Sequence, residues 1–122
     1  AAETGHVVFG TLHTSGAPET INRIIDVFPP EQQSQIKAQI SNSVKMVVTQ
    51  RLIKTKDGLS RVAAFEVMKC TPPIQNLIRE GKVHQIPSVI QTSAKDGMIE
   101  MRKSLEDLVR DGKIDGSIAK EN

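Results

Sequence analysis

The sequence predicts an α/β fold, and three observations carry that prediction. Residues 7–12 form a short, continuous apolar run, which is typical of a strand buried on both faces. Two stretches of strand-forming residues flank Asp57-Gly58, a strong hairpin signal because both residue types accept positive φ. Elsewhere apolar residues recur at helical spacing, as they do across residues 21–28. The length of 122 residues suits one domain of ordinary size.

The first half of the chain is predicted to combine helices and strands. The buried strand of residues 7–12 precedes a helix over residues 17–28, which ends at two prolines because the residue before a proline leaves the α region. A second helix is expected over residues 30–50, with apolar side chains on one face. The two strands of the hairpin are expected over residues 51–56 and 61–69.

The second half of the chain is predicted to be helical. A helix over residues 72–80 is expected to end at Gly81, because glycine adopts the left-handed conformation that ends many helices. Further helices are expected over residues 83–90 and 98–109, and a small terminal helix over residues 114–118.

Composition and charge argue against several classes of function. The formal net charge is +2, from 16 Lys and Arg against 14 Asp and Glu, which is too weak to indicate a nucleic-acid partner. Aromatic residues make up only 2% of the chain, so stacking platforms for single-stranded nucleic acid are not expected. The apolar runs are too short for a transmembrane helix, so direct membrane insertion is not expected. The single cysteine, Cys70, cannot form an internal disulfide and fits a reducing compartment.

Two histidines flank the predicted strand of residues 7–12. Seven residues at about 3.3 Å each would place His6 and His13 roughly 23 Å apart, so the two cannot chelate one metal ion, and no metal site is predicted. His13 would lie at the carboxyl end of the strand, where ligands bind in parallel α/β sheets, with Thr11 on the same side. This pair suits a γ-phosphate or a catalytic water. Local chemistry alone favours the alternative, a turn histidine that bonds to nearby backbone.

These 122 residues contain no complete catalytic constellation and no glycine-rich phosphate loop with its lysine. Glu66 is predicted to face the apolar side of its strand, together with Ala64 and Met68. A carboxylate there is either a general base or, as is favoured here, the partner of Arg51 or Arg61 across the hairpin. The basic side chains of the hairpin are interpreted as solvated charges of an edge strand, with phosphate contact as the less favoured alternative.

Four segments together resemble a known protein family. Residues 2–14, AETGHVVFGTLHT, resemble the His box of secretion and type IV pilus ATPases. Residues 73–80, PIQNLIRE, resemble the C-terminal signature of the pilus retraction (twitching-motility, PilT) branch, and residues 20–29 and 61–68 also match that branch. Extension-type and secretion-type relatives usually carry a tetracysteine zinc module after the Gln-Arg-Leu that stands here at residues 50–52. This chain has no cysteine there, which favours the retraction branch.

The resemblance implies a RecA-like P-loop ATPase that assembles as a hexamer at the cytoplasmic face of the inner membrane. There it would contact the type IV pilus machinery and couple Mg-ATP hydrolysis to pilus retraction. Residues 1–70 would be the C-terminal portion of the ATPase core, with one buried strand, helices and a β-hairpin. Residues 71–122 would be a helical C-terminal region that carries the retraction signature.

The resemblance also implies three sets of site residues. The His box would place Thr11, His13 and Thr14 near the γ-phosphate, with Glu3 and His6 in support. Arg51 and Arg61 are candidate phosphate or subunit contacts. The retraction signature, expected to be needed for retraction and not for hydrolysis as such, comprises Ile74, Asn76, Leu77, Ile78, Arg79 and Glu80.

Two departures from the family pattern limit what the resemblance implies. The signature usually begins Ala-Ile-Arg, whereas Pro73 and Gln75 stand here for the Ala and the Arg, so no role of that arginine is carried over. The Walker A loop, the Asp box and the Walker B acidic residues precede the His box in the family and do not occur in this sequence.

We therefore expect ATP and Mg to bind in the complete protein, and we expect the chain alone to bind neither tightly and to be inactive. The strand of residues 7–12 is expected to lack its neighbours and to expose apolar faces. A non-catalytic α/β module that docks a protein partner is the alternative interpretation.

Overall fold

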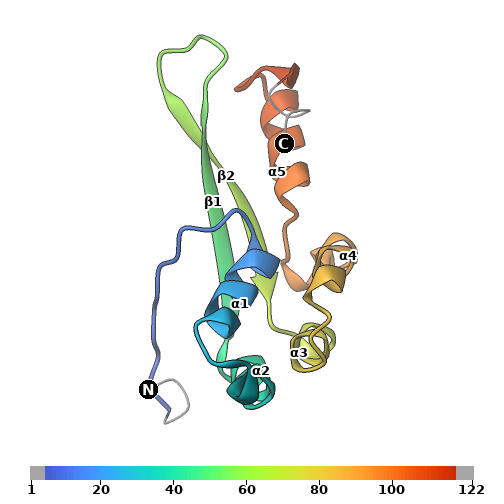
Figure 1. Cartoon of the computed structure of the whole chain (residues 1–122). Helices are drawn as coiled ribbons and strands as arrows, with labels where there is room; N and C mark the ends of the chain where they lie inside the picture. Colours follow the sequence, from blue (N-terminus) through green and yellow to red (C-terminus); the bar gives the residue numbers. More distant parts are fainter. Residues whose placement is uncertain (1–4, 118–122) are drawn as a thin grey trace.

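The computed structural model of the chain describes residues 5–117. The elements follow in the order α1 (Ala17–Asp26), α2 (Pro30–Ser43), β1 (Met46–Lys54), β2 (Arg61–Lys69), α3 (Pro72–Arg79), η2 (Val83–Gln85), α4 (Ile86–Thr92), η3 (Ala94–Asp96) and α5 (Met101–Arg110). In Figure 1, α1, α2, α3 and α4 lie at the lower half of the β1–β2 hairpin, and α5 runs beside its upper half. The predicted α/β fold class is confirmed.

Only the first hairpin strand differs from the prediction: it starts earlier, at Met46, and it ends at Lys54 instead of Lys56. β2 has the predicted bounds, but the expected continuation of the second helix to Gln50 is wrong, because α2 ends at Ser43 and β1 starts at Met46. Residues 46–49 pair antiparallel with residues 66–69. Residues 46–49 carry β-branched and unbranched side chains that fit a strand as well as a helix. Pairing with β2 therefore decides that they form a strand.

The hairpin turn is held by Asp57, as the Asp-Gly pair predicts. Thr55 Oγ1 donates a hydrogen bond of 2.6 Å to Asp57 Oδ1, and the Leu59 N–H donates one of 2.9 Å to the same oxygen. These hydrogen bonds, that of Thr55 first, lower the pKa of the Asp57 carboxyl. Gly58 has a φ of +75°, a conformation in which a Cβ would be strained.

The predicted strand over residues 7–12 is not formed. Figure 1 shows the segment as a long irregular trace that leads to α1. A strand needs a neighbour for its N–H and C=O groups, and the sheet formed by the described residues contains only β1 and β2. The apolar side chains are exposed, as expected for a strand without neighbours: Val7 is 84% and Phe9 is 94% exposed.

The two faces of the hairpin have different surroundings. One face carries the buried side chains Ile53, Ala64 and Met68, which α1, α3, α4 and α5 help to cover. On the other face apolar side chains are exposed, including Leu52 and Phe65. Among residues 5–117, the helices therefore pack on one side of a two-stranded sheet.

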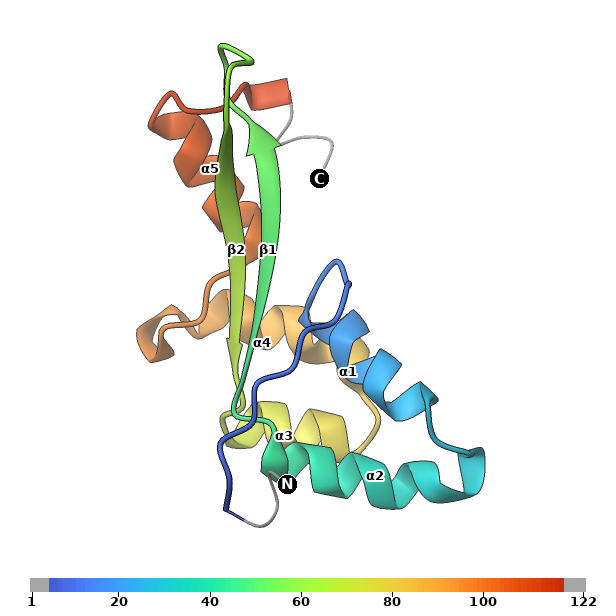
Figure 2. The ribbon, with the colours of Figure 1, turned by 90° about the vertical axis from the view of Figure 1, so that its left-hand side faces the viewer.

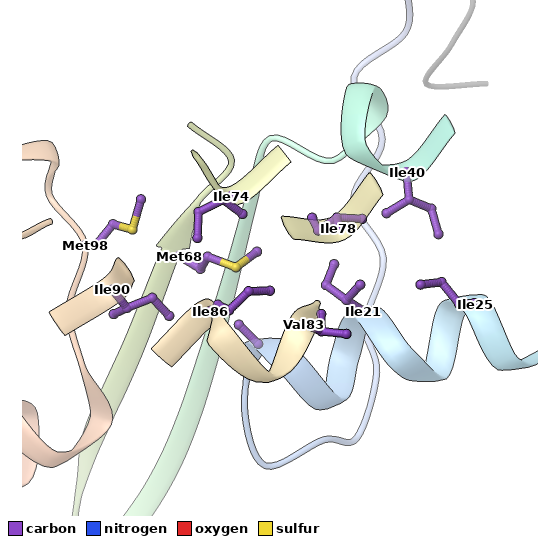
Figure 3. Packing of buried hydrophobic residues seen from close by; sticks show 11 residues of the cluster. Ile21, Ile25, Ile40, Met68, Ile74, Ile78, Val83, Ile86, Ile90 and Met98 are labelled. Atoms are coloured by element: carbon purple, nitrogen blue, oxygen red, sulfur yellow. The ribbon is translucent and has the colours of Figure 1, made fainter. Parts of the chain in front are cut away.

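The core forms two clusters along the covered face. The larger one, shown in Figure 3, joins α1, α2, β2, α3 and α4 through Ala17, Ile21, Ile25, Ile40, Met68, Ile74, Ile78, Val83, Ile86, Ile90 and Met98. The smaller one lies under α5 and comprises Ile53, Ala64, Met101, Leu105 and Ile114. The larger cluster thus contains residues of both predicted parts of the chain, residues 1–70 and residues 71–122.

α3 ends at the predicted glycine. Gly81 has a φ of +73°, the Lys82 N–H donates to the Leu77 carbonyl at 2.8 Å, and the Gly81 N–H donates to the Ile78 carbonyl at 3.2 Å. This is the Schellman arrangement, which satisfies carbonyls that the end of a helix leaves without partners. The Lys37 ammonium of α2 lies close to this end of α3, 3.0 Å from where a Cβ on Gly81 would be. Figure 2 shows α2 and α3 side by side below the hairpin.

The start of the predicted terminal helix is also seen. Residues 116–117 are helical, and the Ser117 N–H donates a 3.0 Å hydrogen bond to Asp115 Oδ1, which caps the first turn. Ile114 is buried under α5, whereas Ile118 lies outside the described residues.

Replacing Ile78 by alanine tests the importance of the larger cluster. Ile78 is fully buried, so Ile78→Ala should lower the free energy of unfolding by about 2–5 kcal/mol. The exposed neighbour Arg79 is the matched control, and Arg79→Ala should change it by less than about 0.5 kcal/mol. Urea unfolding followed by far-ultraviolet circular dichroism measures both, and equal losses would contradict the assignment of Ile78 to the core.

Candidate functional site

The candidate His-box residues lie on the irregular segment that enters α1. Thr11 and His13 are exposed, Thr14 is half-buried, and His6 is exposed further toward the N-terminus. Glu3 lies outside the described residues. The structure therefore places Thr11, His13 and Thr14 on one short stretch of backbone just before the first helix.

Thr14 is anchored to α1 by a defined set of hydrogen bonds. Its hydroxyl lies 2.6 Å from that of Thr20, which is buried, and the Thr20 hydroxyl donates to the Gly16 carbonyl at 2.9 Å. A hydroxyl has one proton, so Thr20 accepts from Thr14. The Thr14 proton is therefore already used inside the protein, and toward a ligand Thr14 has only acceptor capacity in this arrangement.

Glu19 holds the residue after Thr14. Both the N–H of Ser15, at 2.9 Å, and the hydroxyl of Ser15 donate to Glu19 Oε2, and Arg23 lies 3.1 Å from Glu19 Oε1. The hydrogen bonds from Ser15, its hydroxyl first, lower the pKa of the Glu19 carboxyl, and the Arg23 charge adds to this. A carboxylate in the first turn of α1 is also favoured by the positive end of the helix dipole.

Glu66 has a role that the sequence analysis missed. Its Oε1 accepts a 2.8 Å hydrogen bond from the N–H of Ala17, the first residue of α1. The favoured prediction, a partnership with Arg51 or Arg61, did not include this helix cap. Arg61 pairs with Lys54 in the register, far along β2 from Glu66. A glycine directly before the helix is the sequence signal that could have indicated a capping group from elsewhere.

The two arginines lie at different distances from the His box. Arg51 is half-buried on the covered face of the hairpin, where it pairs with Ala64, two residues from Glu66. Arg61 is exposed and begins β2 on the opposite face, about 17 Å of strand away from Glu66. In the register Arg51, but not Arg61, therefore lies within two residues of Glu66.

The charges at the start of α1 determine which groups could bind an anion there. Helix N-termini commonly bind phosphate, but here Glu66 accepts from Ala17 and Glu19 accepts from Ser15. Two carboxylates therefore already occupy this end of the helix. A phosphate group would have to be recognised by the exposed His13 and Thr11 side chains and not by the helix terminus.

The retraction signature divides into a buried and an exposed half. Ile74 and Ile78 are fully buried and Leu77 is half-buried against the larger cluster, whereas Asn76, Arg79 and Glu80 are exposed. On the exposed side Arg79 Nη1 donates a 2.8 Å hydrogen bond to Asn76 Oδ1, and Glu80 pairs with the Lys82 ammonium at 3.4 Å. The exposed polar groups at this end of α3 are therefore already oriented by their neighbours.

Other possible sites are few within residues 5–117. In that range no three or more His, Cys, Asp and Glu side chains are grouped to hold a metal ion, and no helix has the length and apolar character needed to span a membrane. A shallow depression of about 400 Å³ at the hairpin tip is lined by Thr55, Lys56, Asp57, Gly112 and Lys113. It lies at the end of the hairpin away from α1 (Figure 1).

Comparisons with known proteins agree with the motifs. Residues 1–58 match the family model of the type II/IV secretion system proteins. A twitching motility protein of Neisseria gonorrhoeae is 51% identical over 114 residues, which cover 93% of this chain and 30% of that protein. The type IV pilus retraction ATPase PilT of Pseudomonas aeruginosa is 50% identical over 121 residues, 99% of this chain and 35% of that protein.

The fold is matched as well. A crystal structure described as the pilus retraction motor PilT with bound ADP superposes with a TM-score of 0.82 at 39% identity, over 95% of this chain and 32% of that one. The chain is therefore similar in sequence and fold to pilus retraction ATPases, and over residues 1–58 to the type II/IV secretion system proteins. It spans about a third of the length of the relatives it matches.

Acidification should release the loop that Glu19 holds. The folded-state pKa of Glu19 is below its ordinary value of 4.5, so the Ser15 contacts stabilise the fold above pH 4.5 and are lost as the pH falls through the lower folded-state pKa. The chemical shift of the Ser15 amide proton should follow this titration in NMR spectra. Glu19→Gln should abolish the response and Glu106→Gln should leave it intact; a Ser15 shift that titrates unchanged in Glu19→Gln would contradict the assignment.

Proposed function

We propose that this chain is the C-terminal part of a motor ATPase that drives type IV pilus retraction. The observation that carries the proposal is the identity of about half over nearly the whole chain to proteins named for twitching motility and pilus retraction. The fold match to a retraction motor with bound ADP supports a nucleotide as the ligand of the complete protein. In this proposal residues 1–70 complete an ATPase core and residues 71–122 form the helical C-terminal region.

The complete protein would bind ATP with Mg through a phosphate loop and acidic residues that lie outside these 122 residues. It would assemble as a hexamer at the cytoplasmic face of the inner membrane and contact the pilus machinery there. His13 and Thr11, which are exposed before α1, would face the γ-phosphate. Thr14, whose proton is donated to Thr20, would set the position of this segment and would not donate a hydrogen bond to the phosphate oxygens.

This division of roles follows from the geometry of the segment. An imidazole and a hydroxyl on an exposed loop become an effective electrostatic site only when other residues exclude water and supply the remaining charges. The carboxylates at the start of α1 orient the loop but would repel a phosphate placed directly on the helix terminus. Neighbouring parts of the complete protein must therefore supply the cationic groups of the nucleotide site.

ATP hydrolysis tests the proposal directly. The isolated chain should hydrolyse no ATP above background, while the intact protein that includes the upstream phosphate loop should show turnover. In the intact protein His13→Ala should lower kcat by about a hundredfold, and Glu106→Ala, an exposed ion-pair variant, should keep the wild-type value. Hydrolysis by the isolated chain, or none by the intact protein, would overturn the proposed function.

The exposed half of the signature should act in retraction and not in hydrolysis. Arg79→Ala and Glu80→Ala in the intact protein should abolish pilus retraction in a twitching assay and keep ATP turnover within about twofold, because both side chains are exposed, Arg79 at the end of α3 and Glu80 directly after it. Ile78→Ala should reduce both activities because it destabilises the core. Equal loss of retraction and turnover in Arg79→Ala would contradict this separation.

A further inference from the structure

The carboxylate of Glu66 reaches the His-box segment from another element. Glu66 lies on β2, is half-buried, and accepts from the Ala17 N–H across a sequence separation of 49 residues. A hydrogen bond from a backbone N–H to a carboxylate is about twice as strong as one between neutral groups. This contact therefore ties the first turn of α1 to the hairpin.

The residue that precedes α1 cannot provide this cap itself. Helices usually start at a residue such as Ser or Asp, whose side chain accepts from a free N–H of the first turn, but Gly16 has no side chain. The absence of a Cβ also permits the close approach, since a Cβ on Gly16 would lie 3.3 Å from Glu66 Oε1. Gly16 thus leaves space for the carboxylate, and Glu66 supplies the hydrogen-bond acceptor.

The peptide group between Gly16 and Ala17 is also held through its carbonyl. The carbonyl of Gly16 and the N–H of Ala17 belong to one planar peptide group, so fixing one fixes the direction of the other. That carbonyl accepts from the Thr20 N–H at 3.1 Å and from the Thr20 hydroxyl at 2.9 Å. The Thr20 hydroxyl in turn accepts from Thr14. A continuous path of hydrogen bonds therefore connects Glu66 to the residue that follows His13.

We propose that Glu66 is a positioning residue of the His box: by holding the Gly16–Ala17 peptide group against β2, it orients Thr14 and, through it, His13. This inference rests on the proposed ATPase function for its effect on turnover, but the contact itself does not. Glu66 touches no nucleotide in this assignment and acts only through the path of hydrogen bonds. Bonds in such a path polarise and support one another, so loss of the carboxylate should loosen all of them.

The test compares Glu66→Ala with Glu66→Gln in the intact protein. Alanine removes the acceptor, so hydrogen exchange in a peptide that covers residues 13–20, read by mass spectrometry, should speed up by about tenfold. Pro18 has no amide proton, which makes Ala17 prominent in that peptide. The kcat for ATP should fall by about tenfold, with the KM changed by less than about twofold, because a displaced group affects the transition state more than binding.

Glutamine keeps an acceptor oxygen at the same place and should restore exchange and kcat to within about threefold of wild type. Glu106→Ala, which removes an exposed carboxylate from α5, is the control and should change neither. If Glu66→Ala does not fold, Gly16→Ala provides a second route to the same contact, because its methyl group would lie 3.3 Å from Glu66 Oε1 and would push the carboxylate away by a few tenths of an ångström; it should also speed up exchange and lower kcat.

The outcomes separate the two proposals. Unchanged exchange in Glu66→Ala and Gly16→Ala would overturn the positioning role, and so would faster exchange with an unchanged kcat or an equal loss of kcat in the glutamine variant. Absence of ATP turnover in the wild-type intact protein would overturn the proposed function, and the exchange measurement would still decide whether Glu66 holds the segment.

Discussion

The covered face of β2 is the surface on which the rest of the described structure depends. Side chains alternate between the two faces of a strand, so Ala64, Glu66 and Met68 point to the same side. Met68 joins the larger cluster, Ala64 the smaller one, and Glu66 between them caps α1. A shift of β2 by one residue would turn all three to the open face and remove both clusters and the cap together. The register of one strand therefore holds the helices and the candidate site in place.

This arrangement gives the candidate site an unusual mixture of order and exposure. The backbone at the start of α1 is fixed by carboxylates from two different elements, by Glu19 at Ser15 and by Glu66 at Ala17. His13, a short distance before it, is exposed to solvent. A side chain that is to act on a group supplied by another part of a protein needs both properties, since it must be held in one direction and still be accessible. On α3 the same principle appears in another form, because buried isoleucines fix the helix while Asn76 and Arg79 order each other on its surface.

Several elements could be predicted from local sequence, and others could not. The bounds of β2, the Asp-Gly turn and the end of α3 at Gly81 depend on side-chain alternation and on glycine conformations that neighbouring residues determine. The start of β1 could not be predicted in this way, because the apolar residues after Ser43 suit either a helix or a strand until β2 pairs with them. The apolar run of residues 7–12 was wrongly predicted to be a strand here for the related reason that strand formation requires a neighbour. The cap from Glu66 joins residues far apart in the chain, so no local pattern contains it.

The sequence by itself determined the resemblance to pilus retraction ATPases, the positions of most helices and the residue types of the His box and the retraction signature, because motifs and helical periodicity are properties of neighbouring residues. Only the tertiary structure decided which of those residues are exposed and which of their hydrogen-bonding groups are already used inside the protein. It showed that the Thr14 proton is donated to Thr20, that Ile74 and Ile78 belong to the core while Arg79 and Glu80 remain on the surface, and that Glu66 holds the start of α1. The physical reason is that burial and hydrogen-bond partners are set by which elements pack together, and packing brings together residues that are distant in the chain.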